Sequence, residues 1–138
     1  HTPYKDYTDL ALALDAIRRR WPAAELYATC ATGGRPDMAL SVLGLLAGYT
    51  DAPVWIEEDE VTARILHQDE TWTIENAEGK TFSIIAIAPN TKVSEHGLEW
   101  ELDHSRLGLL ADTGISNVVR KTAKIQVHQG VAIAYLYK

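Results

Sequence analysis

Two short segments of the chain carry residues that could bind a polyphosphate. The first, Lys5-Asp6-Tyr7-Thr8-Asp9, places two carboxylates, a hydroxyl and an ammonium just before an apolar helical pattern. Free backbone N–H groups and the helix dipole favour anions at such a position, and carboxylate oxygens suit Mg²⁺. Lys5 would then neutralise phosphate oxygens. The alternative is simple helix capping, because Asp and Thr are common before the first turn.

The second segment, Gly33-Gly34-Arg35-Pro36-Asp37, lies between a strand pattern and a helix pattern. Open α/β folds bind ligands at the carboxyl ends of their parallel strands. Glycine lets a phosphate approach the backbone, and the planar guanidinium of Arg35 offers paired donors to its oxygens. The segment lacks the lysine of a Walker loop and the third glycine of a dinucleotide fingerprint. A plain turn with a surface arginine is therefore the alternative.

The other chemistry-bearing residues form no known constellation. The five histidines and Cys30 show no zinc-ligand spacing. Ser116 lacks the second glycine of a nucleophile elbow, so we predict no hydrolase triad. Trp72 and Trp100 alternate with polar residues on predicted strands, where tryptophan is more often part of the core or sheet surface than a ligand platform.

The two phosphate-binding candidates are flanked by elements that hydrophobic periodicity predicts. Helices are predicted over residues 8–20 and from Pro36 to about Gly48, where apolar residues recur at helical spacing. Short strands are predicted over residues 25–30 and 53–57. The order helix, strand, helix, strand is typical of a parallel α/β sheet.

From Val61 onward the pattern changes to short runs of β-branched and aromatic residues. Strands are predicted over residues 61–67, 70–76, 80–88, 98–102, 123–128 and 131–137, with a hairpin turn at Ala77-Glu78-Gly79. This pattern predicts an antiparallel sandwich or barrel. We therefore expect an α/β segment in residues 1–60, as the end of a Rossmann-like domain, and an all-β antiparallel sandwich in residues 61–138.

The predicted α/β segment is too small to cover its own sheet. Parallel sheets are almost always buried on both faces, and two strands with two helices leave faces and edges open. We therefore expect further strands to complete this sheet. They would come either from another chain or from sequence upstream of His1, and we favour the second source. We also expect this chain alone to associate into a dimer or larger species.

Composition excludes several classes of protein. The 138 residues are 46% hydrophobic and 23% charged, as in a globular protein, and the net charge of −6 disfavours nucleic acid as a partner. The basic run Arg18-Arg19-Arg20 falls near a predicted helix end, where cations complement the dipole. No stretch reaches the roughly 18 apolar residues of a membrane span. The single Cys30 suggests a reducing compartment, so we expect a cytoplasmic location.

The order of the motifs resembles the thiamine pyrophosphokinase family over essentially the whole chain. KDYTD is followed by GGRPD after a strand, then by GLEWEL, then by GISN, and the chain ends in a strand rich in Ala, Val and Ile. The resemblance implies a Rossmann-like domain that binds ATP and Mg²⁺, a β-sandwich domain, and a homodimer with thiamine between its subunits. Met38 and Val42 depart from the polar residues usual in the family at those places.

Site residues follow from this resemblance position by position. Asp6 and Asp9 would bind the metal, and Asp9, Arg35 and Asp37 would form the catalytic group. The resemblance also implies an ATP-binding and a thiamine-binding set, which are Lys5, Asp6, Thr8, Gly34 and Arg35 for ATP and Trp100, Ser116 and Asn117 for thiamine.

The expected reaction is the transfer of pyrophosphate from ATP to thiamine, giving thiamine diphosphate and AMP. The family's other acidic loop should lie upstream of His1, so we expect this chain alone to be inactive. The alternative is a non-catalytic β-sandwich that binds a ligand or regulates, with the α/β part as its support. Met38 favours that alternative.

Overall fold

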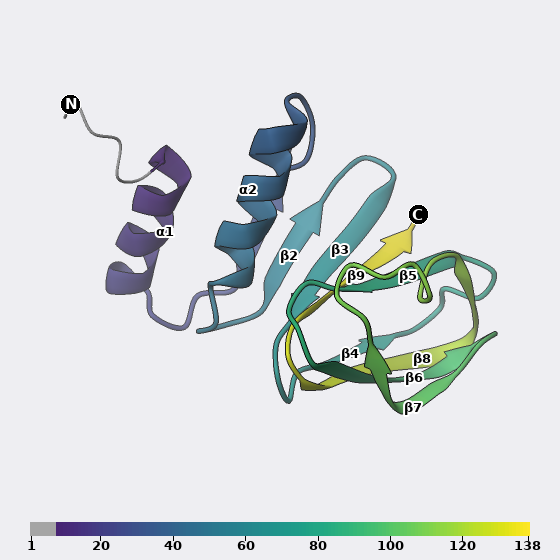
Figure 1. Cartoon of the computed structure of the whole chain (residues 1–138). Coiled ribbons are helices and arrows are strands. Elements are labelled where there is room, and N and C mark those ends of the chain that lie inside the picture. The colour runs from purple at the N-terminus through teal and green to yellow at the C-terminus, as the bar shows by residue number, and fades with distance from the viewer. Residues whose placement is uncertain (1–7) are drawn as a thin grey trace.

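The computed structural model describes residues 8–138 and contains two helices followed mainly by strands (Figure 1). The helices come first in the chain and β3 to β9 follow β2 without another helix in the described part. Their bounds are α1 (Asp9–Arg20), β1 (Leu26–Thr29), α2 (Pro36–Ala47), β2 (Val54–Glu57), β3 (Val61–Leu66), β4 (Thr71–Ile74), β5 (Thr81–Ala86), β6 (Thr91–Leu98), β7 (Leu102–Leu107), β8 (Asn117–Gln129) and β9 (Ala132–Tyr137).

Local sequence explains where both helices begin. The Thr8 hydroxyl accepts a hydrogen bond from the backbone N–H of Ala11 (3.2 Å), which makes Thr8 the N-cap of α1. Pro36 is the first residue of α2, where its missing N–H costs nothing and its fixed φ suits the helix. The two predicted helices are therefore confirmed to within one residue at each end.

The strands form one mostly antiparallel arrangement in the order β1-β2-β3-β9-β5-β8-β6-β7, with β4 paired to β8. Among the paired strands of residues 8–138, only β1 and β2 run parallel. β9 lies inside the sheet, with β3 on one side and β5 on the other. β8 pairs with β5 at its first two residues and with β4 and β6 beyond them, so this long strand joins two sheets.

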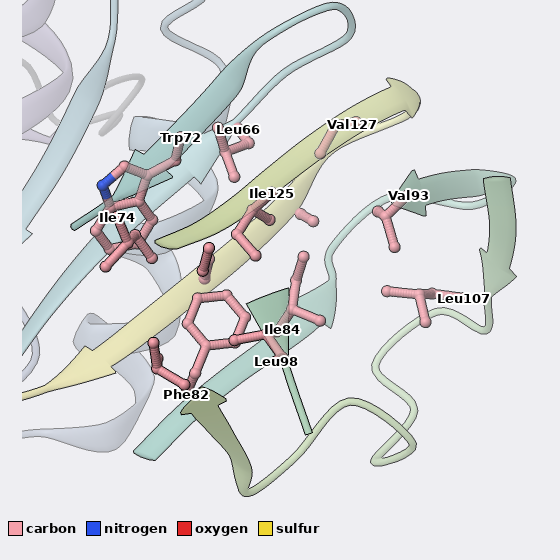
Figure 2. Packing of buried hydrophobic residues seen from close by; sticks show 14 of the residues in the cluster. Leu66, Trp72, Ile74, Phe82, Ile84, Val93, Leu98, Leu107, Ile125 and Val127 are labelled. Atoms are coloured by element: carbon pink, nitrogen blue, oxygen red, sulfur yellow. The ribbon is translucent and has the colours of Figure 1, made fainter. Parts of the chain in front are cut away.

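The elements stack in three layers with two hydrophobic clusters between them. The helices pack on one face of β2, β3 and β9 through residues such as Leu46, Val54, Ile65 and Ile133. The second cluster fills the sandwich between the two sheets, where the labelled side chains point toward one another (Figure 2). The middle sheet is thus covered on both faces. Strands in such a sheet tend to be apolar at successive positions, because the side chains on both of their faces are buried.

Two sequence predictions in the β region are wrong. The predicted strand over residues 98–102 is a turn, because Leu98 ends β6 and Leu102 begins β7. The turn after Ala77 exists, with the Lys80 N–H donating to the Ala77 carbonyl (3.0 Å), but it forms no hairpin. β4 pairs with β8 and β5 pairs with β9, so this turn connects the two sheets.

No helix in the described part of the chain has the length and apolar character needed to cross a membrane.

Candidate functional site

The predicted phosphate-binding residues near the start of the chain are only partly described. Lys5 and Asp6 lie outside the described residues. Thr8 is the N-cap of α1, so the capping interpretation of this residue is confirmed. Asp9 is the first helical residue and is exposed, which leaves its carboxylate open to solvent. The helix dipole favours a carboxylate there whether or not it binds a ligand.

The loop that follows β1 is fixed to the residue that follows β2. Glu58 Oε1 accepts hydrogen bonds from the backbone N–H groups of Ala31 (3.0 Å) and Thr32 (3.3 Å) and from the Thr32 hydroxyl (3.1 Å). Because β1 and β2 are parallel, their carboxyl ends meet at one edge of the sheet. In open α/β sheets, ligands bind at the corresponding edge.

Arg35 and Asp37 are in direct contact at this edge. Arg35 Nε lies 3.1 Å from Asp37 Oδ1, and one terminal nitrogen of the guanidinium lies 2.6 Å from Oδ2. The arginine fork beside it lowers the pKa of the Asp37 carboxyl. Both side chains are exposed. A phosphate that binds Arg35 must therefore displace Asp37 from the guanidinium or share it.

A pocket of about 400 Å³ adjoins this pair, between α1, the loop after β1 and α2. Its walls are mainly apolar and include Leu10, Ala39 and the two departures Met38 and Val42. Arg35 is its charged residue. A larger pocket, of about 610 Å³, lies between α1 and α2 and contains none of the predicted site residues. The smaller pocket is therefore the one that adjoins the predicted phosphate-binding residues.

Of the residues predicted to bind thiamine, Trp100 lies in the turn between β6 and β7, with 63% of its surface exposed. Asn117, at the start of β8, holds this turn by two hydrogen bonds to the Trp100 backbone. The Trp100 N–H donates to Asn117 Oδ1 (3.0 Å), and Asn117 Nδ2 donates to the Trp100 carbonyl (2.7 Å). Oδ1 also accepts from the Val118 N–H (2.9 Å). The amide of Asn117 is therefore engaged within the fold.

Ser116 lies next to Asn117 and has a left-handed backbone, with φ of 62°. Its N–H donates to the hydroxyl of Ser83 (3.0 Å), which ties the start of β8 to β5. The residue is exposed. Ser116 is thus linked to the Trp100 turn only through its neighbour Asn117.

Glu95 is a buried acidic residue beside this site that the sequence analysis missed. It is 1% exposed, and Asn117 Nδ2 lies 3.5 Å from its Oε2. Burial raises the pKa of Glu95 to about 7, and the Asn117 hydrogen bond opposes this only in part. The residue was missed because β6 itself was not predicted over residues 91–98, so its inward-facing positions were not assigned.

The two groups of site residues lie in different layers of the fold. Asp9 and Asp37 lie in the helices and Arg35 in the loop just before α2, whereas Trp100 lies in the turn between β6 and β7 and Asn117 at the start of β8. Figure 1 shows α1 and α2 on one side of β3 and the β6–β7 hairpin on the other. No contact between the two groups is present among residues 8–138 in the hydrogen bonds and ion pairs of the structure.

Known proteins share both the sequence pattern and the fold. Residues 67–132 match the family described as "Thiamin pyrophosphokinase, vitamin B1 binding domain". The chain is 27% identical over 126 residues to Thiamine pyrophosphokinase 1 of Arabidopsis thaliana, covering 85% of this chain and 47% of the relative. It therefore spans about half the length of this curated relative.

Solved structures agree at the level of the fold. Thiamine pyrophosphokinase from Bacillus subtilis superposes with a TM-score of 0.77 at 21% identity, covering 98% of this chain and 65% of that chain. Thiamin pyrophosphokinase from Geobacillus thermodenitrificans gives a TM-score of 0.76 at 23% identity, covering 98% and 63%. The arrangement of helices and sheets described above is thus shared with these proteins.

Proposed function

We propose that the complete protein belongs to the thiamine pyrophosphokinase family and transfers the pyrophosphoryl group of ATP to thiamine. The observation that carries the proposal is the match of residues 67–132 to the vitamin B1 binding domain, within which Asn117 presents Trp100. Residues 61–138 would form the thiamine-binding sandwich, and residues 1–60 the end of a Rossmann-like ATP-binding domain. The products would be thiamine diphosphate and AMP, formed in the cytoplasm.

Trp100 would bind the cationic thiazolium ring of thiamine. Its exposed indole offers an aromatic face, and a cation over such a face gains about 1 to 2 kcal/mol when water is excluded. Asn117 would act mainly by holding the Trp100 turn, because its amide already makes hydrogen bonds to the backbone. The exposed Ser116 would supply a hydroxyl at the rim of the site.

The ATP side would use the residues at the carboxyl end of β1. The thiamine hydroxyl oxygen would attack the β-phosphorus and lose its proton to solvent, the bond from that phosphorus to the α–β bridging oxygen would break, and AMP would leave. Arg35 and Lys5 would neutralise the phosphate oxygens, and the Gly34 backbone would let a phosphate approach closely. Asp37 would orient either the thiamine hydroxyl or the metal once a phosphate draws Arg35 away from it.

Mg²⁺ would accompany ATP, and the described residues supply only part of its site. Asp9 and Asp37 offer the oxygen ligands that Mg²⁺ prefers. Within residues 8–138, however, no group of three or more His, Cys, Asp or Glu side chains is arranged to hold a metal ion. Asp9 would therefore bind the ion together with Asp6, and the bound ion would neutralise phosphate charge.

A homodimer would bring the two groups of site residues together. Within one chain they occupy different layers, whereas two copies could place the Trp100 turn of one subunit against the phosphate edge of the other. Homodimers most often use a two-fold axis, which would generate two equivalent composite sites. Such a composite site is consistent with the separation described above.

The direct test is an assay for thiamine-dependent AMP release by the complete protein with Mg²⁺ and ATP. We expect AMP and thiamine diphosphate in equal amounts. No AMP above the thiamine-free control would contradict the proposed reaction.

A non-catalytic thiamine-binding module is the second candidate function. The mainly apolar pocket beside Arg35, with Met38 and Val42 in its walls, favours it. Thiamine binding in calorimetry without any AMP release would support this candidate.

A further inference from the structure

Glu95 is an acidic side chain inside the sandwich that the proposed reaction leaves without a role. Its neighbours across the strands are Ile125 on β8 and Leu102 on β7, both apolar. Val93, two residues earlier on β6, belongs to the core between the sheets. Burying a carboxyl group among apolar residues costs folding free energy unless the group is hydrogen-bonded or paired with a charge.

The hydrogen bonds of Glu95 are incomplete. Oε2 accepts from Asn117 Nδ2 at 3.5 Å, and Oε1 has no hydrogen-bond partner among the described residues. Asn117 Nδ2 also donates to the Trp100 carbonyl at 2.7 Å. The two N–H bonds of one amide group therefore connect the buried carboxyl to the backbone of the turn that carries Trp100.

No charged partner explains the burial of this carboxyl. Burial and the Asn117 hydrogen bond are the two causes that set its pKa, to about 7. The facing strands β4, β5 and β9 contain no Asp, Glu, Lys, Arg or His. On its own strand Lys92 is half-buried and His96 is exposed. The charged residues of the adjoining turn, and those of β7 and β8 near its partners, are exposed, namely Glu99, Glu101, Asp103, Arg120 and Lys124.

We propose that Glu95 is a positioning residue of the thiamine site, which acts through Asn117 on the Trp100 turn. When the Glu95 carboxyl is ionised, it favours the binding of a cationic aromatic ligand. This inference rests on the proposed binding of thiamine. An ionised carboxylate accepts the Asn117 hydrogen bond more strongly than the neutral acid, because charge-assisted bonds are stronger. The ionised carboxylate also places a negative charge close to the Trp100 turn. A cation bound at that turn would stabilise this charge.

Linkage makes the effect measurable. If the cation binds the ionised form more tightly, thiamine affinity must rise as Glu95 loses its proton, and thiamine must in turn lower the pKa of Glu95. Between pH 6 and pH 8 most Glu95 side chains would change their ionisation state. A coupling at the lower end of the usual range is about 5-fold in the dissociation constant.

The experiment compares the chain with Glu95→Gln, which keeps the shape and an amide oxygen but cannot ionise. Thiamine dissociation constants are measured by calorimetry at pH 6, 7 and 8. We expect affinity in the unmodified chain to rise about 5-fold or more with pH relative to the variant. Titration of thiamine itself and of the surface histidines is common to both proteins and cancels in the ratio.

A second readout needs no ligand. The side-chain amide resonances of Asn117, followed by NMR, should titrate with Glu95 in the unmodified chain and stay constant in Glu95→Gln. Glu95→Leu provides a second variant that removes the hydrogen bond but suits the apolar surroundings. We expect Glu95→Leu to fold and to bind thiamine more weakly than the unmodified chain. The ratio of its thiamine dissociation constant to that of Glu95→Gln should be the same at every pH.

The outcomes separate this inference from the proposed function. Equal pH dependence in the unmodified chain and in Glu95→Gln, with thiamine still bound, would overturn the role of Glu95 and leave the function standing. An Asn117 amide that titrates with Glu95, in a protein that binds no thiamine, would instead overturn the function and the ligand-favouring role together.

Discussion

At the scale of single residues, Arg35 and Asp37 are the predicted site residues whose substitution should change activity without changing folding stability. The two predicted catalytic side chains contact each other and are exposed, so neither supports the core. Exposed ion pairs contribute little to folding, whereas a guanidinium that neutralises a transferring phosphate acts in the transition state.

We expect Arg35→Ala in the complete protein to leave the melting temperature unchanged and to lower kcat by about 100-fold or more. Arg19→Ala is the matched control, because Arg19 forms an equally exposed ion pair with Asp15 on α1. Calorimetric melting and the AMP assay measure the two effects. Similar losses of activity in both variants would mean that Arg35 has no catalytic role beyond that of an exposed surface residue.

Burial of Glu95 predicts a pH-dependent stability. Its pKa is raised from 4.5 to about 7, so the folded chain keeps a proton that the unfolded chain loses above pH 4.5. Stability therefore falls as pH rises from about 4.5 to 7, by about 3 kcal/mol in total. Glu95→Gln should match the unmodified chain near pH 4.5 and exceed it by up to that amount at pH 8.

Urea unfolding at pH 4.5, 6 and 8 measures this difference. Glu78→Gln is the control, because Glu78 is exposed in the turn after β4 and should change nothing. An unmodified chain that gains stability between pH 5 and pH 8 relative to Glu95→Gln would contradict the raised pKa.

At the scale of elements, the sequence predicts regular structure well where hydrophobic spacing repeats. α1 and α2 follow from apolar residues at helical spacing and from Thr8 and Pro36 at their starts. Strand β6 was missed because it mixes polar and apolar residues without a clear alternation, and three of its polar side chains, Thr91, Ser94 and Glu95, are buried. Partners distant in sequence decide that burial, so local periodicity does not reveal it.

The same limit applies to the site. Trp100 and Asn117 were proposed together from motif order, and the structure places them in hydrogen-bond contact. That Asn117 holds a backbone turn follows only from the close approach of β8 to the end of β6. Gly97 marks this approach, with φ of 85° and the Thr122 carbonyl oxygen 2.2 Å from where a Cβ would lie.

We therefore expect Gly97→Ala to lower stability by about 3 kcal/mol or more, because it adds a backbone clash to the strain of a left-handed residue. Gly79→Ala is the control, since Gly79 has the same backbone region, φ of 86°, with nothing within 4 Å. It should cost only about 1 to 2 kcal/mol of conformational strain. Equal losses in denaturant titrations would mean that β6 and β8 separate easily at this point.

At the scale of the whole molecule, the separation of the two groups of site residues predicts complementation between subunits. Arg35→Ala and Trp100→Ala inactivate different halves of the proposed composite site. If each site combines two subunits, a mixed dimer of the two variants retains one intact site. Refolding the two inactive proteins together at equal amounts should then restore about a quarter of the unmodified activity.

Light scattering before the assay establishes whether the complete protein is a dimer. Arg35→Ala mixed with a second preparation of Arg35→Ala is the control and should stay inactive. Activity that fails to return in the mixed sample, although dimers have formed, would place both groups of residues within one subunit.

The position of β9 also governs the order in which the molecule can fold during synthesis. β9 comes last among the described strands, yet it pairs with β3 along six residues and with β5 along five. Domains generally fold from the N-terminal end as the ribosome releases them, but β3 and β5 must here wait for residues 132–137. Such late, distant pairing is slow and leaves apolar strand edges open in the nascent chain. Translation stopping just before Ala132 would therefore leave a gap in the middle of the sheet, and chaperones should bind that nascent chain until its final strand arrives.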